Sequence, residues 1–442
     1  MKITKLIARQ VLDSRGNPTI EVEAYFNNIK ASAIVPSGAS TGKYEALELR
    51  DGKKAYLGKS VMKAVKNVNK VIAKKVVGME FLDQKSIDEM MIALDGTKNK
   101  SKLGANAILG VSMAVCRLAA LIKQKQLYEY VAELAHDNNK AGLISSLPIA
   151  NLIYAKRSTR PAKLYSIPVP FANVINGGKH AGSSLKIQEF MIAPIYAKTF
   201  KDAVRMTAEV YHTLKKLVEE KYGKAATNVG DEGGFAPQLT TPEQALDLLV
   251  EAIKKAGYKK KIKIGIDSAA SEFYDETTGC YVMDKSYTKD EMIEYYVRLL
   301  KKYPIATLED PFDQDDFESW NKLTEKASKL KVPIIGDDLL VSNTERIKIA
   351  IEKKLCSALL LKVNQIGTVT EAINAARMAH DAGWIVMVSH RSGETEDTFI
   401  ADLAVGLGCG HIKLGAPCRS ERVAKYNQLL RIEENHIKYA KW

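Results

Sequence analysis

Cysteine is scarce in this sequence and shows no pairing pattern. Five cysteines occur in 442 residues, at Cys116, Cys280, Cys356, Cys409 and Cys418. Their number is odd and their spacing is irregular, which excludes a disulfide framework and a four-cysteine zinc site. We therefore expect a reducing compartment and a cytoplasmic location, although a surface or secreted pool cannot be read from sequence.

Long uninterrupted apolar runs are also absent. The longest apolar stretch, Ala105 to Ile122, is interrupted by Asn106 and Arg117. A membrane-spanning helix needs about 20 nearly continuous apolar residues, so we predict a buried core helix here and no transmembrane segment. The first residues, MKITKLIARQVLD, return to polar side chains too early for a secretory signal.

Basic residues outnumber acidic ones, and the formal net charge is +13. The lysines lie in short runs such as Lys53-Lys54 and Lys259-Lys260-Lys261, without interleaved aromatic residues or a nucleic-acid motif. This pattern is typical of a solvated surface that also attracts an anionic small-molecule substrate. It argues against nucleic acid as a partner.

The chain is too long for one ordinary hydrophobic core, so we predict two domains. Residues 1–136 indicate a small α+β domain, in which an alternating strand at Thr19–Tyr25 pairs with Ala31–Val35. Residues 137–165 lose periodicity and carry prolines and a basic cluster, which indicates a connection with an inserted segment. Residues 166–442 form the second predicted domain.

The second domain repeats a strand-then-helix pattern in which each apolar run ends in a charged residue. The spacing between most of these ends fits the roughly 30 residues of one strand, one helix and two loops. A longer first gap leaves room for an extra loop or hairpin near 272–285. The pattern predicts a closed β/α barrel with its site at the carboxyl ends of the strands. The charged ends are Asp267, Glu309–Asp310, Asp337–Asp338, Lys362, His390 and Lys413.

Three of these ends are carboxylates on successive predicted strands: Asp267, Glu309 and Asp337. A barrel brings them to one point, where they repel one another unless a cation lies between them. Oxygen ligands without cysteine or histidine select a hard ion such as Mg²⁺. Any one acid alone would more simply be a helix cap or a loop residue, but three in register favour a metal site.

Lys362 ends an otherwise apolar strand, and two interpretations stay open from its position alone. Nearby cations and burial could lower its pKa and leave a neutral amine that acts as a base. The lysine could instead pair with one of the same acids. Arg391 and Ser392, after His390, suit an anion, and Lys413 adds a further cation.

Eight stretches, in order along the whole chain, resemble the enolase family. Single glycine-rich fragments are weak evidence, but eight long matches in family order are specific. They are DSRGNPT (Asp13–Thr19), VPSGASTG (Val35–Gly42), LDGTKNKSKLGANAILGVS (Leu94–Ser112), NGGKHA (Asn176–Ala181), QEFMIAP (Gln188–Pro194), GDEGG (Gly230–Gly234), LLLKVNQIGT (Leu359–Thr368) and SHRSGETED (Ser389–Asp397).

The resemblance implies a small N-terminal α+β domain followed by an enolase-type, TIM-like β/α barrel. It also implies a hydro-lyase of glycolysis and gluconeogenesis that reversibly dehydrates 2-phospho-D-glycerate to phosphoenolpyruvate. A lysine base would remove the proton alpha to the carboxylate, and two Mg²⁺ ions per active site would stabilise the enolate. It implies a phosphorylated small-molecule substrate. It also implies that the chain assembles as a homo-oligomer, either a dimer or an octamer.

The resemblance assigns roles to particular residues. Lys362 matches the base, and Glu232 the acid that assists departure of hydroxide from carbon 3, with Glu189 beside it and His180 on a closing loop. Asp267, Glu309 and Asp337 match the high-affinity metal triad, and Ser40 a loop ligand of the second metal. The implied substrate contacts are His180, Glu189, Glu309, Asp337, Lys362, His390, Arg391, Ser392 and Lys413.

Two rival functions remain beside this one. Another enzyme of the same superfamily would share the metal acids, but it would lack the Ser40 loop, the His180 loop and the SHRSG phosphate site together. A catalytically idle binding protein would be expected to have lost Lys362 or Glu232, and both are present. The segment at 137–165 is longer than the family's usual link, and we expect it to bear on assembly or surface partners rather than chemistry.

Overall fold

The N-terminal domain is built on a three-stranded antiparallel sheet in the order β1-β2-β3. The computed structural model describes residues 1–39, 42–136, 165–182 and 184–441. β1 spans Lys5–Leu12, β2 Pro18–Phe26 and β3 Ile29–Ile34. The predicted pairing of the second and third strands is confirmed, with Glu21 opposite Ile34. Asn27 makes the tight turn between them at φ +52°, a conformation that asparagine tolerates.

Helices cover one side of this sheet, and the longest of them is the predicted apolar helix. Their bounds are α1 Met62–Asn67, α2 Ala73–Val76, α3 Gln84–Asp95, α4 Ala105–Ile122 and α5 Leu127–His136. By length and composition α4 could cross a membrane, but 83% of it is buried inside the protein. Gly110 lets it approach the sheet, because a Cβ there would lie 2.6 Å from Val22. The prediction of a core helix is confirmed.

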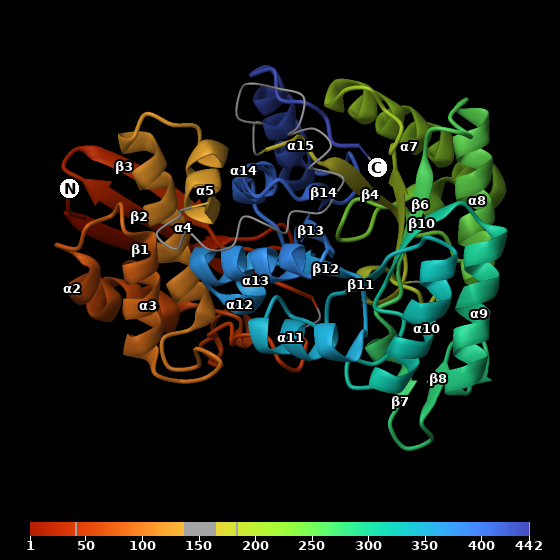
Figure 1. The fold of residues 1–442 in the computed structure, drawn as a ribbon, viewed down its shortest axis with the longest axis horizontal. Helices are drawn as coiled ribbons and strands as arrows, with labels where there is room; N and C mark the ends of the chain where they lie inside the picture. Colours follow the sequence, from red (N-terminus) through yellow and green to blue (C-terminus); the bar gives the residue numbers. More distant parts are fainter. Residues whose placement is uncertain (40–41, 137–164, 183, 442) are drawn as a thin grey trace.

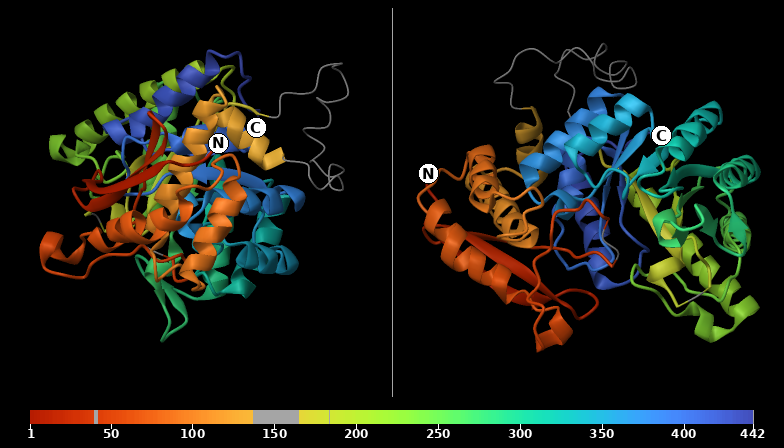
Figure 2. Two further views of the ribbon diagram at one scale, coloured as in Figure 1. Left: turned by 90° about the vertical axis from the view of Figure 1, so that its left-hand side faces the viewer. Right: turned by 90° about the horizontal axis from the view of Figure 1, so that it is seen from below.

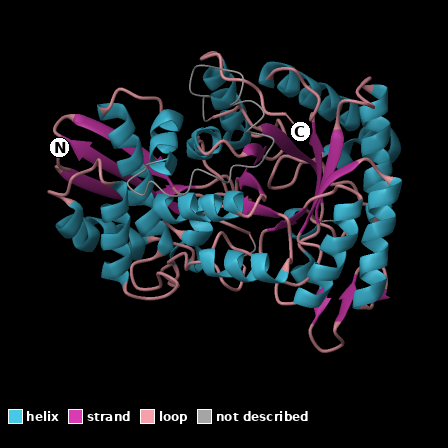
Figure 3. Cartoon of the chain, in the orientation of Figure 1, coloured by secondary structure: helices cyan, strands magenta, loops and turns pink. Residues whose placement is uncertain are grey.

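The second domain is a closed barrel in the strand order β10-β11-β12-β13-β14-β4-β5-β6 (Figure 1). Figure 3 shows these strands surrounded by helices. The strands are β4 Val169–Asn176, β5 Glu189–Ala193, β6 Lys263–Asp267, β10 Ile305–Glu309, β11 Ile334–Gly336, β12 Ala358–Leu361, β13 Ile385–Ser389 and β14 Gly410–Lys413. The predicted barrel is confirmed, and its last six strands are those whose ends were identified from sequence.

One strand departs from the simple β/α repeat. β5 runs antiparallel to both β4 and β6, because the connection from β4 to β5 is a loop rather than a crossover helix. The first residue of β5 therefore lies at the same edge as the last residues of its neighbours. Glu189 pairs in register with Asp267, so the reversal brings one more carboxylate to the barrel mouth.

Helices follow most strands and form the outer layer. They are α7 Phe200–Tyr222, α8 Pro242–Lys255, α9 Lys289–Lys302, α10 Phe317–Lys329, α11 Thr344–Lys353, α12 Val363–Ile366, α13 Val369–Asp381, α14 Phe399–Gly406 and α15 Ser420–Glu433. Capping boxes begin α8 and α9, at Thr241 with Gln244 and at Thr288 with Glu291. The expected hairpin is a small sheet of β7 Tyr274–Asp275, β8 Cys280–Val282 and β9 Ser286–Tyr287.

Side chains fill the barrel interior. Phe171 and Met191 are fully buried in a cluster with residues from β10 to β13. Gly265 on β6 makes room for them, because a Cβ there would lie 3.0 Å from the Phe171 ring. The barrel is thus a packed core rather than a pore, and a ligand can enter only at its mouth.

Segments of the N-terminal domain lie against that mouth. Figure 2 shows the two domains side by side, with the segment after β3 reaching the barrel. Ser37 forms a two-way backbone bridge with Gly393, at 2.8 Å in each direction, and Ala46 N donates to Gln365 O at 2.8 Å. The N-terminal domain therefore contributes to the walls of any site at the strand ends.

Candidate active site

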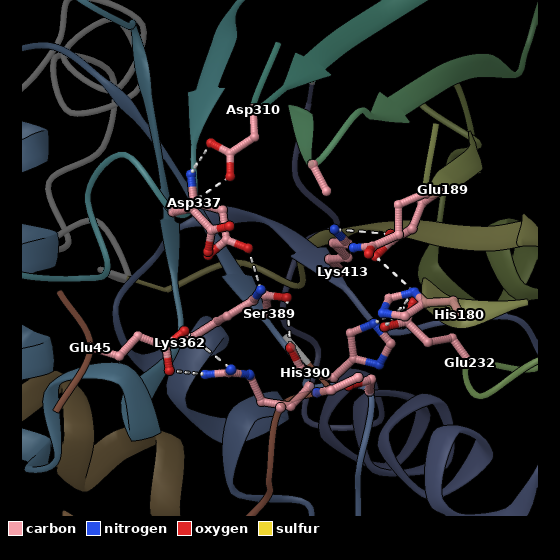
Figure 4. Close-up of a pocket in the computed structure, with 17 residues that line it drawn as sticks. Glu45, His180, Glu189, Glu232, Asp310, Asp337, Lys362, Ser389, His390 and Lys413 are labelled. Carbon is pink, nitrogen blue, oxygen red and sulfur yellow. Dashed lines mark hydrogen bonds and ion pairs between the residues drawn. The ribbon is translucent and has the colours of Figure 1, made fainter. Parts of the chain in front are cut away.

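The charged strand ends meet around a small cavity at the barrel mouth. Figure 4 shows Lys362 and Asp337 on one side of it, and His180, Glu189 and Glu232 on the other, with Lys413 between the two groups. The described lining residues also include Glu45, His390, Arg391 and Ser392. Ser40 lies outside the described residues, so its predicted role stays a prediction.

Lys413, at the end of β14, lies among three acidic side chains and forms an ion pair with each of them. Its Nζ lies 2.9 Å from Glu189 Oε2, from Asp267 Oδ2 and from Glu309 Oε1. Burial alone would lower the pKa of Lys413, but the surrounding carboxylates raise it well above its usual value. Lys413 is therefore a permanent cation beneath the cavity.

Lys362, directly after β12, forms a close ion pair with Asp337 Oδ2. Burial opposes its charge, but Asp337 outweighs burial and raises the pKa of Lys362. Burial and nearby cations therefore do not leave Lys362 neutral in this arrangement, because Asp337 outweighs their effect. Of the two interpretations left open by the sequence, the ion pair is the one seen in this structure.

The predicted metal acids are divided between these two lysines. Asp267 and Glu309 share Lys413, whereas Asp337 pairs with Lys362. Burial, followed by repulsion from Asp267, raises the pKa of Glu309 well above its usual value. Among the described residues, the buried Glu309 Oε2 has no hydrogen-bond partner. A carboxylate set with excess negative charge and an unsatisfied buried oxygen fits a hard cation.

Two other groups have ligand atoms close enough to share an ion. One is His180 with Glu189 and Glu232, and the other is Asp310 with Asp337 and Asp338. Asp310 also accepts from the backbone N of Asp337 at 2.8 Å and of Asp338 at 2.7 Å, which fixes the turn after β11. Burial and then Asp337 raise the pKa of Asp338 to about 8. The sequence identifies Asp310 and Asp338 as strand-end residues but assigns them no role, because each directly follows another acid.

The far side of the cavity holds a histidine–glutamate cluster. Glu232, in the loop between α7 and α8, has Oε2 3.2 Å from His390 Nε2 and accepts from Asn173 Nδ2 at 3.1 Å. His180 Nδ1 lies 3.7 Å from Oε1 of both Glu189 and Glu232.

These groups have strongly shifted pKa values. Burial would raise the pKa of Glu232, but His390 and His180 lower it well below its usual value. Glu189 has the opposite environment: burial and the neighbouring Glu232 raise its pKa well above the usual range. The two adjacent glutamates thus differ in how readily they ionise, a pattern typical of acid–base sites.

Arg391 and Ser392 follow β13, where the sequence predicts an anion site. The Arg391 guanidinium contacts Glu45 through two nitrogens, at 3.0 and 3.2 Å, and donates to Asn364 Oδ1 at 3.1 Å. Ser392 Oγ accepts from the backbone N of Ala39 at 2.6 Å. Both residues therefore hold the segment that follows β3 against the barrel.

Three residues with evident roles were missed by sequence reasoning. Glu45 reaches Arg391 from the N-terminal domain, and Gln365 Nε2 donates both to Asp337 Oδ1 at 2.8 Å and to Glu45 Oε1 at 3.3 Å. Arg422, in the first turn of α15, lies behind His390 and is fully buried. Of these, only Gln365 falls in a stretch that carries the resemblance, LLLKVNQIGT. Within that stretch, the sequence assigns a role to Lys362 and none to Gln365.

The fold and the site define a class of protein: a β/α-barrel enzyme with buried lysines, carboxylates and an arginine around one cavity. Two family models match the chain, "Enolase, N-terminal domain" over residues 3–131 and "Enolase, C-terminal TIM barrel domain" over residues 164–442. The chain is also 54% identical over 446 aligned positions to Enolase B of Dictyostelium discoideum, covering 98% of this chain and 95% of that protein. The chain therefore belongs to the enolase family, and it is a lyase of the phosphopyruvate hydratase type.

Proposed function

We propose that the residues of this cavity carry out the reversible dehydration of 2-phospho-D-glycerate to phosphoenolpyruvate by proton removal at Lys362 and hydroxide departure assisted by Glu232. The observation that supports this most is the placement of these two side chains on opposite sides of one cavity, with Lys413 between them (Figure 4). A substrate bound across Lys413 has one face toward a base and the other toward an acid.

Asp267, Glu309 and Asp337 would hold one Mg²⁺, and Ser40 would contribute to a second. Bound Mg²⁺ supplies the positive charge that stabilises the extra negative charge on the substrate carboxylate when the carbon-2 proton leaves. Enolase-superfamily sites are an established example of a Lys or His base beside Mg²⁺. The buried Oε2 of Glu309 supports this ligand set, since it has no hydrogen-bond partner among the described residues.

Lys362 removes the proton from carbon 2 as the neutral amine. In this structure Asp337 keeps Lys362 charged, and a cation held by Asp337 would weaken that ion pair and favour the neutral amine. The electron pair of the carbon–hydrogen bond then forms the double bond between carbons 2 and 3. Gln365 holds Asp337 from the other side and keeps its position when its bond to Lys362 is lost.

Glu232 gives a proton to the hydroxyl on carbon 3, which leaves as water with the electron pair of its bond. In the free protein the pKa of Glu232 is lowered well below its usual value, and His390 Nε2 lies 3.2 Å from its Oε2. An anionic substrate placed beside Glu232 raises the pKa of this carboxyl, so it takes up a proton as the substrate binds. Glu189 and His180 line the same side and hold the hydroxyl end of the substrate.

Arg391 and Ser392 bind the phosphate, Lys413 contacts the substrate carboxylate, and His390 packs beside Glu232. Arginine presents paired donors that match phosphate oxygens. The substrate phosphate competes with Glu45 for the same guanidinium nitrogens.

The proposal also covers the domain bounds, the location and the assembly of the protein. Residues 1–136 form the N-terminal domain, 137–165 a connection with an inserted segment, and 166–442 the catalytic barrel. The protein works in the cytoplasm as a homo-oligomer, either a dimer or an octamer. These assignments rest on the sequence pattern and on family membership.

The test is turnover of 2-phospho-D-glycerate with Mg²⁺, followed by the absorbance of the enol product. Glycerate, which has the same carbon skeleton without phosphate, serves as the matched control and should not be turned over. Chelation of divalent cations should abolish the signal, and re-addition of Mg²⁺ should restore it. Efficient turnover of glycerate, or activity that survives chelation, would overturn the proposal.

A further inference from the structure

Arg422 is a fully buried arginine whose four Nη hydrogens all have acceptors. Nη1 lies 2.6 Å from His390 Nδ1 and donates to Arg391 O, while Nη2 donates to Asp231 O at 3.0 Å and to Ser392 O. The guanidinium thereby joins the loop after β13 to the loop that carries Glu232. Its Nε lies 3.4 Å from Glu421 Oε1.

The contact with His390 has only one possible direction. A guanidinium has five N–H donors, no acceptor, and does not lose its proton in proteins. His390 Nδ1 must therefore accept, so the neutral ring carries its proton on Nε2. That nitrogen faces Glu232 Oε2 at 3.2 Å.

The two oxygens of Glu232 consequently have different surroundings. Oε2 accepts from Asn173 Nδ2 and faces the His390 Nε2–H. Oε1 lies on the side of His180, 3.7 Å from its Nδ1. Oε1 is thus the oxygen left to exchange a proton with substrate.

We propose that Arg422 is a positioning residue, which fixes His390 as the neutral Nε2–H tautomer and so reserves the transferable proton for Glu232 Oε1. The kinetic consequence rests on the proposed function of Glu232, whereas the tautomer does not. With Nδ1 blocked by a permanent donor, His390 cannot take up a second proton and cannot act as an alternative acid.

The charges that face His390 agree with this assignment. Glu232 and Glu394 favour a protonated ring, whereas burial and Arg422 oppose it. Burial is the largest effect, and the pKa of His390 is lowered to about 4. Gly415, packed between Glu232, Arg422 and His390, keeps the group close, since a Cβ there would lie 3.0 Å from the histidine ring.

The first test uses the wild-type protein and needs no activity. Nitrogen-15 NMR of histidine-labelled full-length protein distinguishes a protonated from an unprotonated ring nitrogen, and His390→Gln assigns the signal. We expect Nε2 protonated, Nδ1 unprotonated, and no titration between about pH 5.5 and 8. A protonated Nδ1, or an imidazolium near pH 7, would overturn the proposal even if every variant failed to fold.

The second test separates the two chemical steps in Arg422→Lys. We expect dehydration to fall on the order of 10²-fold, as for a slightly misplaced group, with carbon-2 proton exchange within about threefold of wild type. The matched control is Arg419→Gln, which removes a neighbouring arginine that contacts Glu421 and Ser14 O instead of His390. In an His390→Asn background the Arg422→Lys loss should vanish.

An equal fall in exchange and dehydration, or no fall in dehydration, would overturn the positioning role. A wild-type protein that neither exchanges nor dehydrates would instead overturn the proposed function, and the NMR result would still decide the tautomer.

Discussion

The Glu45 carboxylate contacts the Arg391 guanidinium at two points, Oε2 to Nη1 at 3.0 Å and Oε1 to Nη2 at 3.2 Å. The two residues come from different domains and are both buried or nearly so. Glu45 thus occupies the nitrogens that the proposed function gives to the substrate phosphate. An internal carboxylate holds the phosphate site in place before an anion arrives.

The first prediction concerns Glu45→Gln. Removing the charge of Glu45 leaves the buried Arg391 cation poorly compensated, which destabilises the fold by up to about 3–5 kcal/mol. Inorganic phosphate should restore the lost charge, so it should raise the melting temperature of the variant more than that of wild type. Melting curves in phosphate and chloride at equal ionic strength measure this. Glu48→Gln, whose partner is Arg50, is the control, and an equal phosphate effect in all three proteins would contradict the prediction.

The second prediction concerns Lys362→Ala, which removes the proposed base. Base catalysis typically contributes 10²–10⁴-fold, and the weak acidity of the carbon-2 proton makes a larger loss reasonable. Exchange of that proton with deuterated solvent should therefore fall by at least about 10²-fold. Lys348→Ala, on the exposed side of α11, should change nothing. Exchange near the wild-type rate in Lys362→Ala would assign the base elsewhere.

The third prediction is that Glu232→Gln separates the two steps. If Glu232 assists only hydroxide departure, carbon-2 exchange should continue while dehydration falls by about 10²–10⁴-fold. Glutamine still accepts from Asn173, so the local fold should survive. Isotope exchange and product absorbance, measured on the same sample, give the ratio. Parallel loss of both signals would show that Glu232 does not act on one step alone.

The fourth prediction concerns the metal acids and stability. A ligand at 100 times its dissociation constant stabilises a protein by about 2.7 kcal/mol. Mg²⁺ should therefore raise the melting temperature of wild type, and Glu309→Gln should lose most of that increase. Without Mg²⁺, Glu309→Gln should change the melting temperature little, because it relieves repulsion from Asp267 but also removes an ion pair with Lys413. A Mg²⁺ effect of wild-type size in the variant would exclude Glu309 as a ligand.

Much of this architecture could be predicted from the sequence because charged residues directly follow short apolar runs. Asp267, Glu309 and Lys413 lie at their strand ends as expected, and closure of the barrel brings them within ion-pair distance. The antiparallel β5 was not predicted, since its charged residue Glu189 begins the apolar run instead of ending it. The sequence left two interpretations of Lys362 open because its partner Asp337 is specified only by the fold.

The missed residues share a physical cause. Glu45 lies more than 300 residues from Arg391 along the chain, and its role depends on how two domains pack. Arg422 lies in a helix of alternating charged and apolar residues, where an arginine ordinarily faces solvent. Only the packing of α15 against the barrel mouth surrounds it with four acceptors.

The last prediction concerns the inserted segment at 137–165, of which residues 137–164 lie outside the described structure. The two family models match residues 3–131 and 164–442, so neither covers most of it. Tyr165, which ends the segment, packs beside Tyr128 at 5.3 Å between ring centroids, and the segment leaves from the far end of the same helix at His136, about 12 Å along its axis. A short link can therefore bridge the gap without moving either domain, and loop closure costs change by only about 0.6 kcal/mol per doubling of length.

Replacing Ala141–Lys163 with a short flexible link should leave turnover within several-fold of wild type, because the described site residues lie outside the segment. If the segment supports assembly, the mass in solution measured by light scattering should fall while activity per site survives. The matched control is a glycine–serine replacement of equal length, which keeps the spacing but removes the prolines and the basic cluster. If the shortened protein stays folded and correctly assembled but loses substrate affinity steeply, the segment must cover the barrel mouth, contrary to this prediction.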